Sequence, residues 1–328
     1  MRKCYLTVGE ELTAVHDIAE KGAWINLINP SEAELNEVEK RLNIPPDLLR
    51  AALDEEERSR IEPDDGQLLI LINIPFEANG ASSLTYDTIP LGIIVTENNL
   101  VTVCLKDNPL LNEFECNKNR SFFTFKKTRF VLQLLFKTAT YYLRYLKQID
   151  KKSAEIEQQL HRSMKNEELI KLLNLGKSLV YFTTSLRANG IVMEKLLRSQ
   201  LKLVRVHPDP DTVITSQILK MYADDEDLLE DVITENKQAI EMCETYSNIL
   251  NSTMDAFASI ISNNLNIVMK FLTSVTIVLA LPTMVASFFG MNVAVPLQHS
   301  PHAFLIVLLG SVLFCGIGIL LLRRKNMF

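Results

Sequence analysis

The chain has 328 residues, of which 47% are hydrophobic, 23% charged and 7% aromatic, enough for about two domains with a sizeable core. This composition excludes a disordered chain, a collagen-like chain and a membrane protein with many spans. Residues 1–270 hold all 40 acidic and 31 of the 34 basic side chains, so they carry −9, whereas residues 271–328 carry +3. No acidic residue follows Asp255, and an acidic body joined to an acid-free apolar tail is atypical of a cytosolic enzyme.

Other features of the composition exclude further classes of protein. The five cysteines are scattered without CxxC spacing, which fits a reducing compartment and argues against a disulfide framework or a zinc finger. The first dozen residues lack the apolar stretch of a signal peptide. The acidic net charge gives no reason to expect a nucleic-acid partner, and inorganic cations are the better expectation. No Walker loop, GxGxxG, HExxH or GxSxG motif is present, so we expect neither an enzyme nor a cofactor.

Residues 1–125 are predicted to form a compact cytoplasmic α/β domain. Ser31 followed by glutamates in the next turn is a typical helix start, and it predicts a helix to residue 42. Apolar runs of strand length, rich in β-branched residues, occupy residues 67–74, 88–96 and 100–104. The last two runs are separated by a short polar turn and are expected to form an antiparallel hairpin.

Long helices are predicted for the rest of the soluble part. Residues 126–205 contain two glycines and no proline, and their periodicity predicts an antiparallel helical pair over 128–164 and 166–203. Pro208 and Pro210 end this pair. Residues 212–281 then contain neither glycine nor proline, so we expect one stalk helix over 212–289; 70 helical residues would extend about 105 Å.

Two charge-free runs, residues 271–289 and 303–322, are each long enough to cross a hydrocarbon core of about 30 Å. The loop between them, residues 290–302, has no Lys or Arg, whereas the tail 323–328 is basic. The positive-inside rule therefore predicts a transmembrane hairpin in the plasma (inner) membrane with both termini cytoplasmic. The alternative is a pair of buried core helices in a soluble protein.

The first span carries a regular row of small or polar residues. Steps of three and four from Gly290 give a heptad row that continues to the last acidic residue of the chain. We call this row the seam; it consists of Asp255, Ser259, Ser262, Asn266, Met269, Thr273, Thr276, Ala280, Thr283, Ser287 and Gly290, and Met269 is its one member that is neither small nor polar. Two interpretations stay open: the seam lets membrane helices pack closely, or several copies of the chain surround an axis and the seam lines a water-filled pore. The length of the row favours the pore.

The seam also restricts the ion. It offers hydroxyl, amide and carbonyl oxygens and, inside the membrane, no carboxylate. Such oxygens suit a hard cation, but Mg²⁺ gives up its waters reluctantly. We therefore expect a cation that keeps much of its hydration shell in the pore.

Gly290-Met291-Asn292 directly follows the first span, and residues 266–273 and Pro282-Thr283 precede it. In this combination the chain resembles the CorA family of divalent-cation channels, whose signature is Gly-Met-Asn at this place. The resemblance implies a funnel-shaped homopentamer with a cytoplasmic α/β domain, a helical pair and one stalk helix per subunit that continues through the membrane. It implies hydrated Mg²⁺ as the cargo, with Co²⁺ and Ni²⁺ as further ions.

The resemblance also implies roles for individual residues. The ion would enter at Asn292, with the carbonyl groups of Gly290 and Met291. The constrictions of the pore would fall on Asn266, Met269, Leu272 and Thr283, and an acidic ring on Asp255.

Relatives with regulatory metal sites place acidic residues on the α/β domain opposite an acidic residue of the neighbouring stalk. Asp231 matches the stalk position, but the expected partners fall on Arg50 and Ala51, and a further acidic position falls on Lys137. The resemblance therefore does not extend to that sensor. A different regulatory Mg²⁺ site could draw on Asp231, Glu55, Glu56, Asp224, Asp225 and Asp227, and the alternative is a solvated acidic face.

Two other functions fit the same architecture. One is a zinc transporter of the same superfamily, and the other is a membrane-tethered scaffold whose seam serves packing alone. His299 and His302 stand three apart in the outer loop, but no third zinc ligand lies nearby in the sequence. The expected partners are divalent cations, the lipid bilayer and further copies of the chain.

Overall fold

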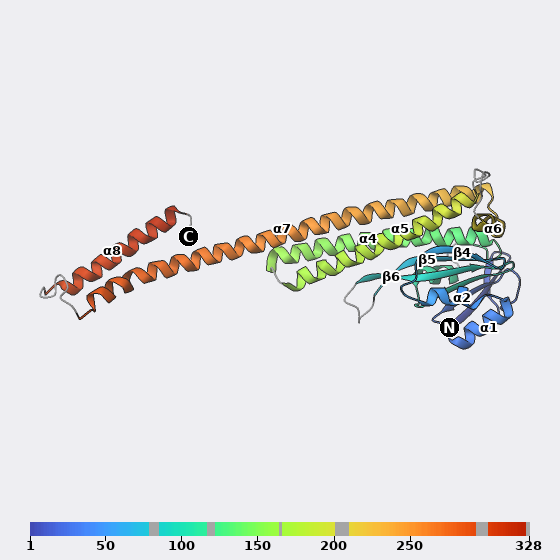
Figure 1. Cartoon of the computed structure of the whole chain (residues 1–328), viewed down its shortest axis with the longest axis horizontal. Helices are drawn as coiled ribbons and strands as arrows, with labels where there is room; N and C mark the ends of the chain where they lie inside the picture. Colours follow the sequence, from blue (N-terminus) through green and yellow to red (C-terminus); the bar gives the residue numbers. More distant parts are fainter. Residues whose placement is uncertain (79–84, 117–121, 164–165, 201–209, 293–300, 326–328) are drawn as a thin grey trace. The chain divides into compact units, whose positions relative to one another are not determined.

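The computed structural model describes residues 1–78, 85–116, 122–163, 166–200, 210–292 and 301–325 (Figure 1). It separates into two compact units, Met1–Ser252 and Thr253–Phe328. The first unit is an α/β domain with long helices, and the second contains the two apolar helices.

The first unit contains a sheet of seven strands in its described residues, in the order β2-β1-β3-β7-β6-β5-β4. Neighbouring strands are antiparallel except β3 and β7, which are parallel. The three strands predicted from the sequence are confirmed as β5, β6 and β7, and the expected hairpin joins β6 to β7. The bounds are β1 Arg2–Val8, β2 Glu11–Ala14, β3 Trp24–Ile28, β4 Arg60–Asp64, β5 Gln67–Glu77, β6 Tyr86–Val95 and β7 Leu100–Cys104.

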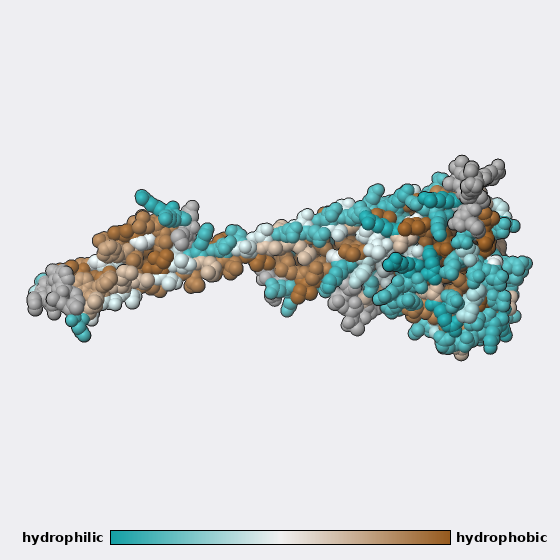
Figure 2. All heavy atoms as spheres, in the orientation of Figure 1, coloured by the Kyte–Doolittle hydropathy of each residue, from teal (hydrophilic) through white to brown (hydrophobic). Residues whose placement is uncertain are grey.

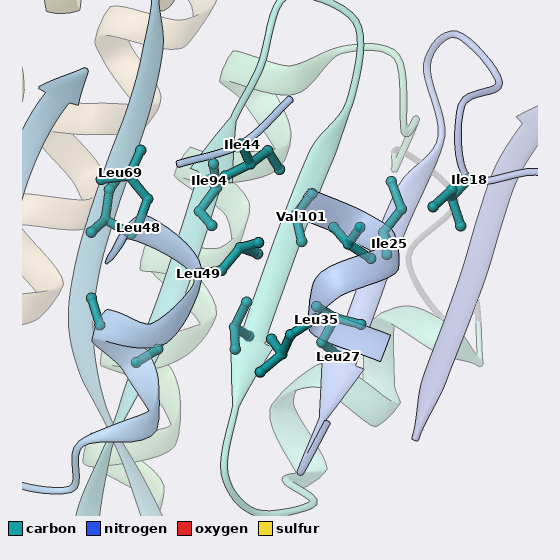
Figure 3. Close-up of a cluster of buried hydrophobic side chains, with 14 of the residues drawn as sticks. Ile18, Ile25, Leu27, Leu35, Ile44, Leu48, Leu49, Leu69, Ile94 and Val101 are labelled. Atoms are coloured by element: carbon teal, nitrogen blue, oxygen red, sulfur yellow. The ribbon is translucent and has the colours of Figure 1, made fainter. Parts of the chain in front are cut away.

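One face of the sheet is covered by α1 (Glu32–Leu42), α2 (Pro46–Arg50) and the short 3-10 helix η1 (Ala51–Leu53). Leu35 of α1 and Leu49 of α2 pack with Ile25, Ile94 and Val101 of the strands in one buried cluster (Figure 3). The predicted start of α1 is confirmed, because the Ser31 hydroxyl accepts a bond from the Glu34 N–H and the Glu34 carboxylate accepts one from the Ser31 N–H.

The opposite face carries α3 (Pro109–Glu115), α4 (Lys127–Ser163) and α5 (Asn166–Gln200). Aromatic side chains fill this layer: the fully buried Trp24 ring lies 5.1 Å from Phe130, and Tyr142 lies 5.0 Å from Phe182. The helical pair predicted from residue 128 onward is present as α4 and α5, and Tyr142 and Phe182 join its two helices.

The expected single stalk helix from residue 212 is wrong at its start. The structure has a separate helix α6 (Pro210–Ile218), and the long helix α7 begins at Ala223 and ends at Phe289. The break contains no glycine or proline; Asp225 makes it, because its carboxylate accepts a bond from the Tyr222 N–H and its own N–H donates to the Tyr222 carbonyl. Pro210 occupies the first position of α6, where a backbone N–H would have no partner within the helix, so a proline is tolerated there.

Within the first unit, α7 packs closely against α5 at two glycines. A Cβ at Gly176 would lie 3.2 Å from Leu250, and one at Gly190 would lie 3.2 Å from the Asn236 amide. Asn236 also donates to the Leu186 carbonyl at 3.0 Å. Because the two glycines and their two partners are each fourteen positions apart, these contacts hold α5 and α7 antiparallel in one register.

Candidate functional site

The last part of α7 and the whole of α8 (Ala303–Arg324) are long and apolar enough to cross a membrane. Their apolar windows are only 6% buried within the chain, and Leu279 and Phe304 are 65% and 80% exposed. The helices of this unit are covered with hydrophobic side chains (Figure 2). Core helices of a soluble protein would be buried, so the core-helix interpretation does not fit this unit.

Small residues hold α7 and α8 together. Ser274 of α7 is fully buried, and the Cys315 thiol of α8 lies 3.6 Å from the Val278 carbonyl. A Cβ at Gly318 would lie 2.9 Å from the Leu281 side chain, so glycine lets the two helices approach. The packing face of α7 therefore runs along residues 274, 278 and 281.

Pro282 explains the contact of the Cys315 thiol. A proline inside a helix has no N–H, so the carbonyl four residues earlier loses its partner. That carbonyl belongs to Val278, and the Cys315 S–H donates to it from α8. In a membrane an unsatisfied carbonyl is costly, so this bond compensates for the proline.

The seam lies on another face of α7. All eleven seam residues and Leu272 are exposed within the chain, from Asp255 to Gly290. Each residue of a helix turns the side chain by about 100°, so the residues that pack on α8 lie about 100–160° around the helix from their nearest seam residues. The seam residues are therefore not used for packing between the two helices of one chain.

Hydrogen bonds fix the direction in which the seam hydroxyls act. Ser259, Thr273, Thr276 and Thr283 each donate to the carbonyl four residues earlier, at 2.8–3.0 Å. Because the hydroxyl proton is used inside the helix, each oxygen presents its lone pairs outward as an acceptor. The Asn266 amide is exposed and makes no hydrogen bond within the described part of the chain. Such a surface accepts hydrogen bonds from the water shell of a cation.

The Gly290-Met291-Asn292 motif stands at the end of α7. The Gly290 N–H continues the helix by donating to the Ala286 carbonyl at 2.9 Å, and all three residues are exposed. His302 precedes α8 without capping it through its side chain, whereas His299 lies outside the described residues.

The acidic residues considered for a regulatory metal do not come together as a group of three or more within the described part of one chain. Asp225 is buried and pairs with Arg129 at 3.1 Å, and Glu55 pairs with Lys106 at 3.4 Å. Glu56, Asp224, Asp227 and Asp231 are exposed or lie at the surface. The described residues include no group of three or more His, Cys, Asp or Glu side chains that could hold a metal ion.

The positions at which the family resemblance predicts acidic residues make other contacts here. Arg50 pairs with Glu32 at 3.0 Å and with Glu39 at 3.6 Å, which fixes α2 to α1. Ala51 is part of the buried cluster under the sheet. Lys137 pairs with Glu113 at 2.6 Å and so joins α4 to α3.

The buried thiols are not reactive groups. Burial raises the pKa of Cys104 and of Cys243 to about 11, so both stay protonated at neutral pH. Cys243 contacts the Leu179 carbonyl at 3.6 Å, in the interface between α5 and α7.

Residues missed by the sequence analysis lie where α7 and α8 meet: Ser274, Val278, Cys315 and Gly318. The signal that could have revealed them is the row of small residues in the second span, Gly310, Ser311, Cys315 and Gly318.

Comparisons with known proteins agree with this architecture. The family described as CorA-like Mg²⁺ transporter protein matches residues 19–324. The cobalt/magnesium transport protein CorA of Methanocaldococcus jannaschii is 30% identical over 309 residues, which are 92% of this chain and 90% of that protein.

Solved structures give the same result. The complete structure of the CorA magnesium transporter from Methanocaldococcus jannaschii matches with a TM-score of 0.82 and 26% identity, over 100% of this chain and 99% of that one. The full-length CmaX protein shares the fold, with a TM-score of 0.70 and 15% identity over 98% of this chain and 97% of that one. The chain therefore belongs to the family of CorA-like Mg²⁺ transporter proteins.

Proposed function

We propose that this protein is a channel for hydrated Mg²⁺, in which the seams of five copies surround an axial pore. The observation that carries the proposal is that the seam is exposed while a different face of α7 holds α8. Polar groups that face lipid are costly, so this face needs water or protein around it. A pore on the axis of a homopentamer supplies water to the seam and covers its flanks with neighbouring α7 helices.

The path of the ion follows from the chemistry of the seam. A hydrated cation meets Asn292 and the carbonyl groups of Gly290 and Met291 first. It then passes hydroxyl oxygens that accept bonds from its water shell, so it need not lose the waters that Mg²⁺ holds strongly. Five copies of Asn266 give a ring of amides below them, and five copies of Asp255 give an acidic ring at the end of the path.

The membrane topology completes the proposal. Membership of the family and two exposed apolar helices support a membrane protein. The basic residues after α8 and the uncharged loop between the spans support cytoplasmic termini in the inner membrane. The acidic first unit would then attract divalent cations on the cytoplasmic side.

The cargo is Mg²⁺, with Co²⁺ and Ni²⁺ as further ions. The Methanocaldococcus jannaschii relative carries the name of a cobalt/magnesium transport protein, which supports this choice. Regulation by internal Mg²⁺ would need ligands from a neighbouring subunit, because the acidic residues of one chain form no site among the described residues.

Flux into proteoliposomes tests the proposal. Asn266→Leu and Asn292→Ala should each reduce Mg²⁺ uptake about tenfold or more, since each removes a ring of amides from the path. Asn263→Leu is the matched control, because Asn263 is exposed on α7 but lies off the seam, and its uptake should stay near that of the unchanged protein. Unchanged uptake in the first two variants would refute the pore, and zinc flux above magnesium flux would refute the cargo.

A further inference from the structure

A large cavity lies in the first unit, in a part of the chain that the transport path does not use. Its volume is about 980 Å³, and it opens where four segments meet. These are the turn between β4 and β5 at Gly66, the turn before β7 at Thr96 and Glu97, the start of α4, and the link between α6 and α7. Ligand cavities in proteins measure roughly 300–1,000 Å³, so this one has room for a molecule of metabolite size.

Four cationic side chains line the cavity, and three of them have no carboxylate partner in a salt bridge with a described residue. Arg129 is balanced by Asp225 at 3.1 Å. Lys127 donates instead to the carbonyl groups of Thr96 and Glu97, both at 2.6 Å, which holds its ammonium group in place. The Lys126 ammonium lies 4.9 Å from the centre of the Phe123 ring, and Lys220 is exposed at the rim.

The position of these cations costs stability unless an anion is present. Lys126, Lys127 and Arg129 gather at the first turn of α4, which contains no acidic residue. The N-terminus of a helix carries partial positive charge, so cations placed there are destabilising. Burial lowers the pKa of Lys127, with Lys21 adding to the effect and Glu97 opposing it, so the folded chain does not fully compensate its charge. The acidic groups that line the same cavity are Glu97, Asp224 and Asp225.

Aromatic rings complete the lining. Phe125 is 52% exposed and Tyr222 is 76% exposed, although both rings are large and apolar in part. Nucleobases stack favourably on exposed aromatic rings of this kind. Uncompensated cations beside exposed rings therefore fit a ligand that has a phosphate group at one end and an aromatic ring at the other.

We propose that this cavity binds a nucleoside phosphate, with the phosphates at Lys126 and Lys220 and the base at Phe125 and Tyr222. The ligand would touch Asp224 and Asp225, which form the first turn of α7. The helix that carries the seam thus begins at this cavity. Binding is independent of the pore, so its test does not depend on transport.

Calorimetric titration of the detergent-solubilised full chain with ATP, in EDTA to remove Mg²⁺, tests the proposal. ATP should bind at one saturable site per chain. The double variant Lys126→Glu/Lys220→Glu should weaken ATP binding about tenfold or more, since it replaces two phosphate-binding cations by anions. Lys147→Glu, an exposed lysine of α4 outside the cavity, should leave ATP affinity unchanged. No saturable binding at millimolar ATP, or equal losses in the two charge reversals, would overturn the proposal.

A second arm identifies the part of the ligand that is recognised. Tyr222→Ala should weaken ATP but leave tripolyphosphate unchanged, because only the base contacts the ring. Equal affinity of the unchanged protein for ATP and tripolyphosphate, or for ATP and inorganic phosphate, would refute recognition of a nucleoside. Fluorescence of the buried Trp24, the single tryptophan of the chain, checks that each variant is folded.

Discussion

Asn189 of α5 extends the hydrogen bonding of the sheet, and its removal should destabilise the first unit strongly. The pairing of β4 with β5 ends at Arg60 and Leu71, so Asn73 lies beyond the partner strand. The fully buried Asn189 amide takes the place of that strand: its oxygen accepts from the Asn73 N–H at 2.9 Å, and its nitrogen donates to the Asn73 carbonyl at 2.7 Å. The oxygen also accepts from the Ser59 hydroxyl at 2.9 Å.

Asn189→Ala leaves the N–H of the half-buried Asn73 without its partner, which costs about 1–3 kcal/mol. The Asn73 carbonyl still accepts a hydrogen bond from the Tyr142 hydroxyl at 3.0 Å, so the loss of its bond from Asn189 adds little to the destabilisation. With the small cavity left by the lost amide, we expect a total loss of about 2–4 kcal/mol.

Urea unfolding followed by Trp24 fluorescence measures this loss, because the single tryptophan is fully buried in the same unit. Asn174→Ala is the matched control, since Asn174 lies on the same helix and forms no hydrogen bond within the described residues. We expect the control to stay within about 0.5 kcal/mol of the unchanged protein. An equally small loss for Asn189→Ala would refute the role assigned to its amide.

Three further predictions concern other contacts. Cys315→Ala should lower the free energy of unfolding of the detergent-solubilised protein by about 1 kcal/mol, and Cys315→Ser should lower it much less. In a Pro282→Ala background the Val278 carbonyl regains its partner within the helix, so Cys315→Ala should then cost nothing. A loss of stability that persists in that background would contradict the compensating bond. Gly318→Leu should push α8 away from α7, which should cost about 1–3 kcal/mol of stability and lower the melting temperature. Gly316→Leu meets open space and should leave the melting temperature unchanged. Equal melting temperatures of the two variants would contradict the close packing. Ser31→Ala should cost about 1 kcal/mol in urea unfolding. The hydrogen bond from the Ser31 N–H lowers the pKa of Glu34. The stabilisation by this carboxylate should therefore be complete at neutral pH and be lost as the pH falls through the pKa that Glu34 has in the folded state. A Glu34→Gln variant whose stability depends on acid pH as much as that of the unchanged protein would contradict this.

The elements with strong local signals could be predicted from the sequence. The helix after Ser31 and the buried strands β5 to β7 carry caps or continuous apolar runs. The strands β2 and β4 were missed because they are short edge strands with charged side chains, and β4 contains Pro63. The break before α7 was missed because a single side chain, Asp225, creates it without glycine or proline.

The seam could also be predicted, because a heptad row is a property of one helix. Its separation from the face that packs on α8 could not, since this depends on which side of α7 meets Cys315 and Gly318. The direction of the hydroxyl groups at Thr273 and Thr283 likewise requires the helix geometry. The sequence therefore predicts a polar row, and the structure adds that this row does not serve the packing of α7 on α8 within one chain.

The most direct test of the pore compares two identical substitutions on one helix. Ala280 lies on the seam and Ala286 does not, and both are exposed within the chain. Ala280→Leu should narrow the pore and reduce Mg²⁺ flux into proteoliposomes about tenfold or more, while Ala286→Leu should leave flux near that of the unchanged protein. Equal flux in the two variants, with both proteins folded and inserted, would contradict a pore lined by the seam.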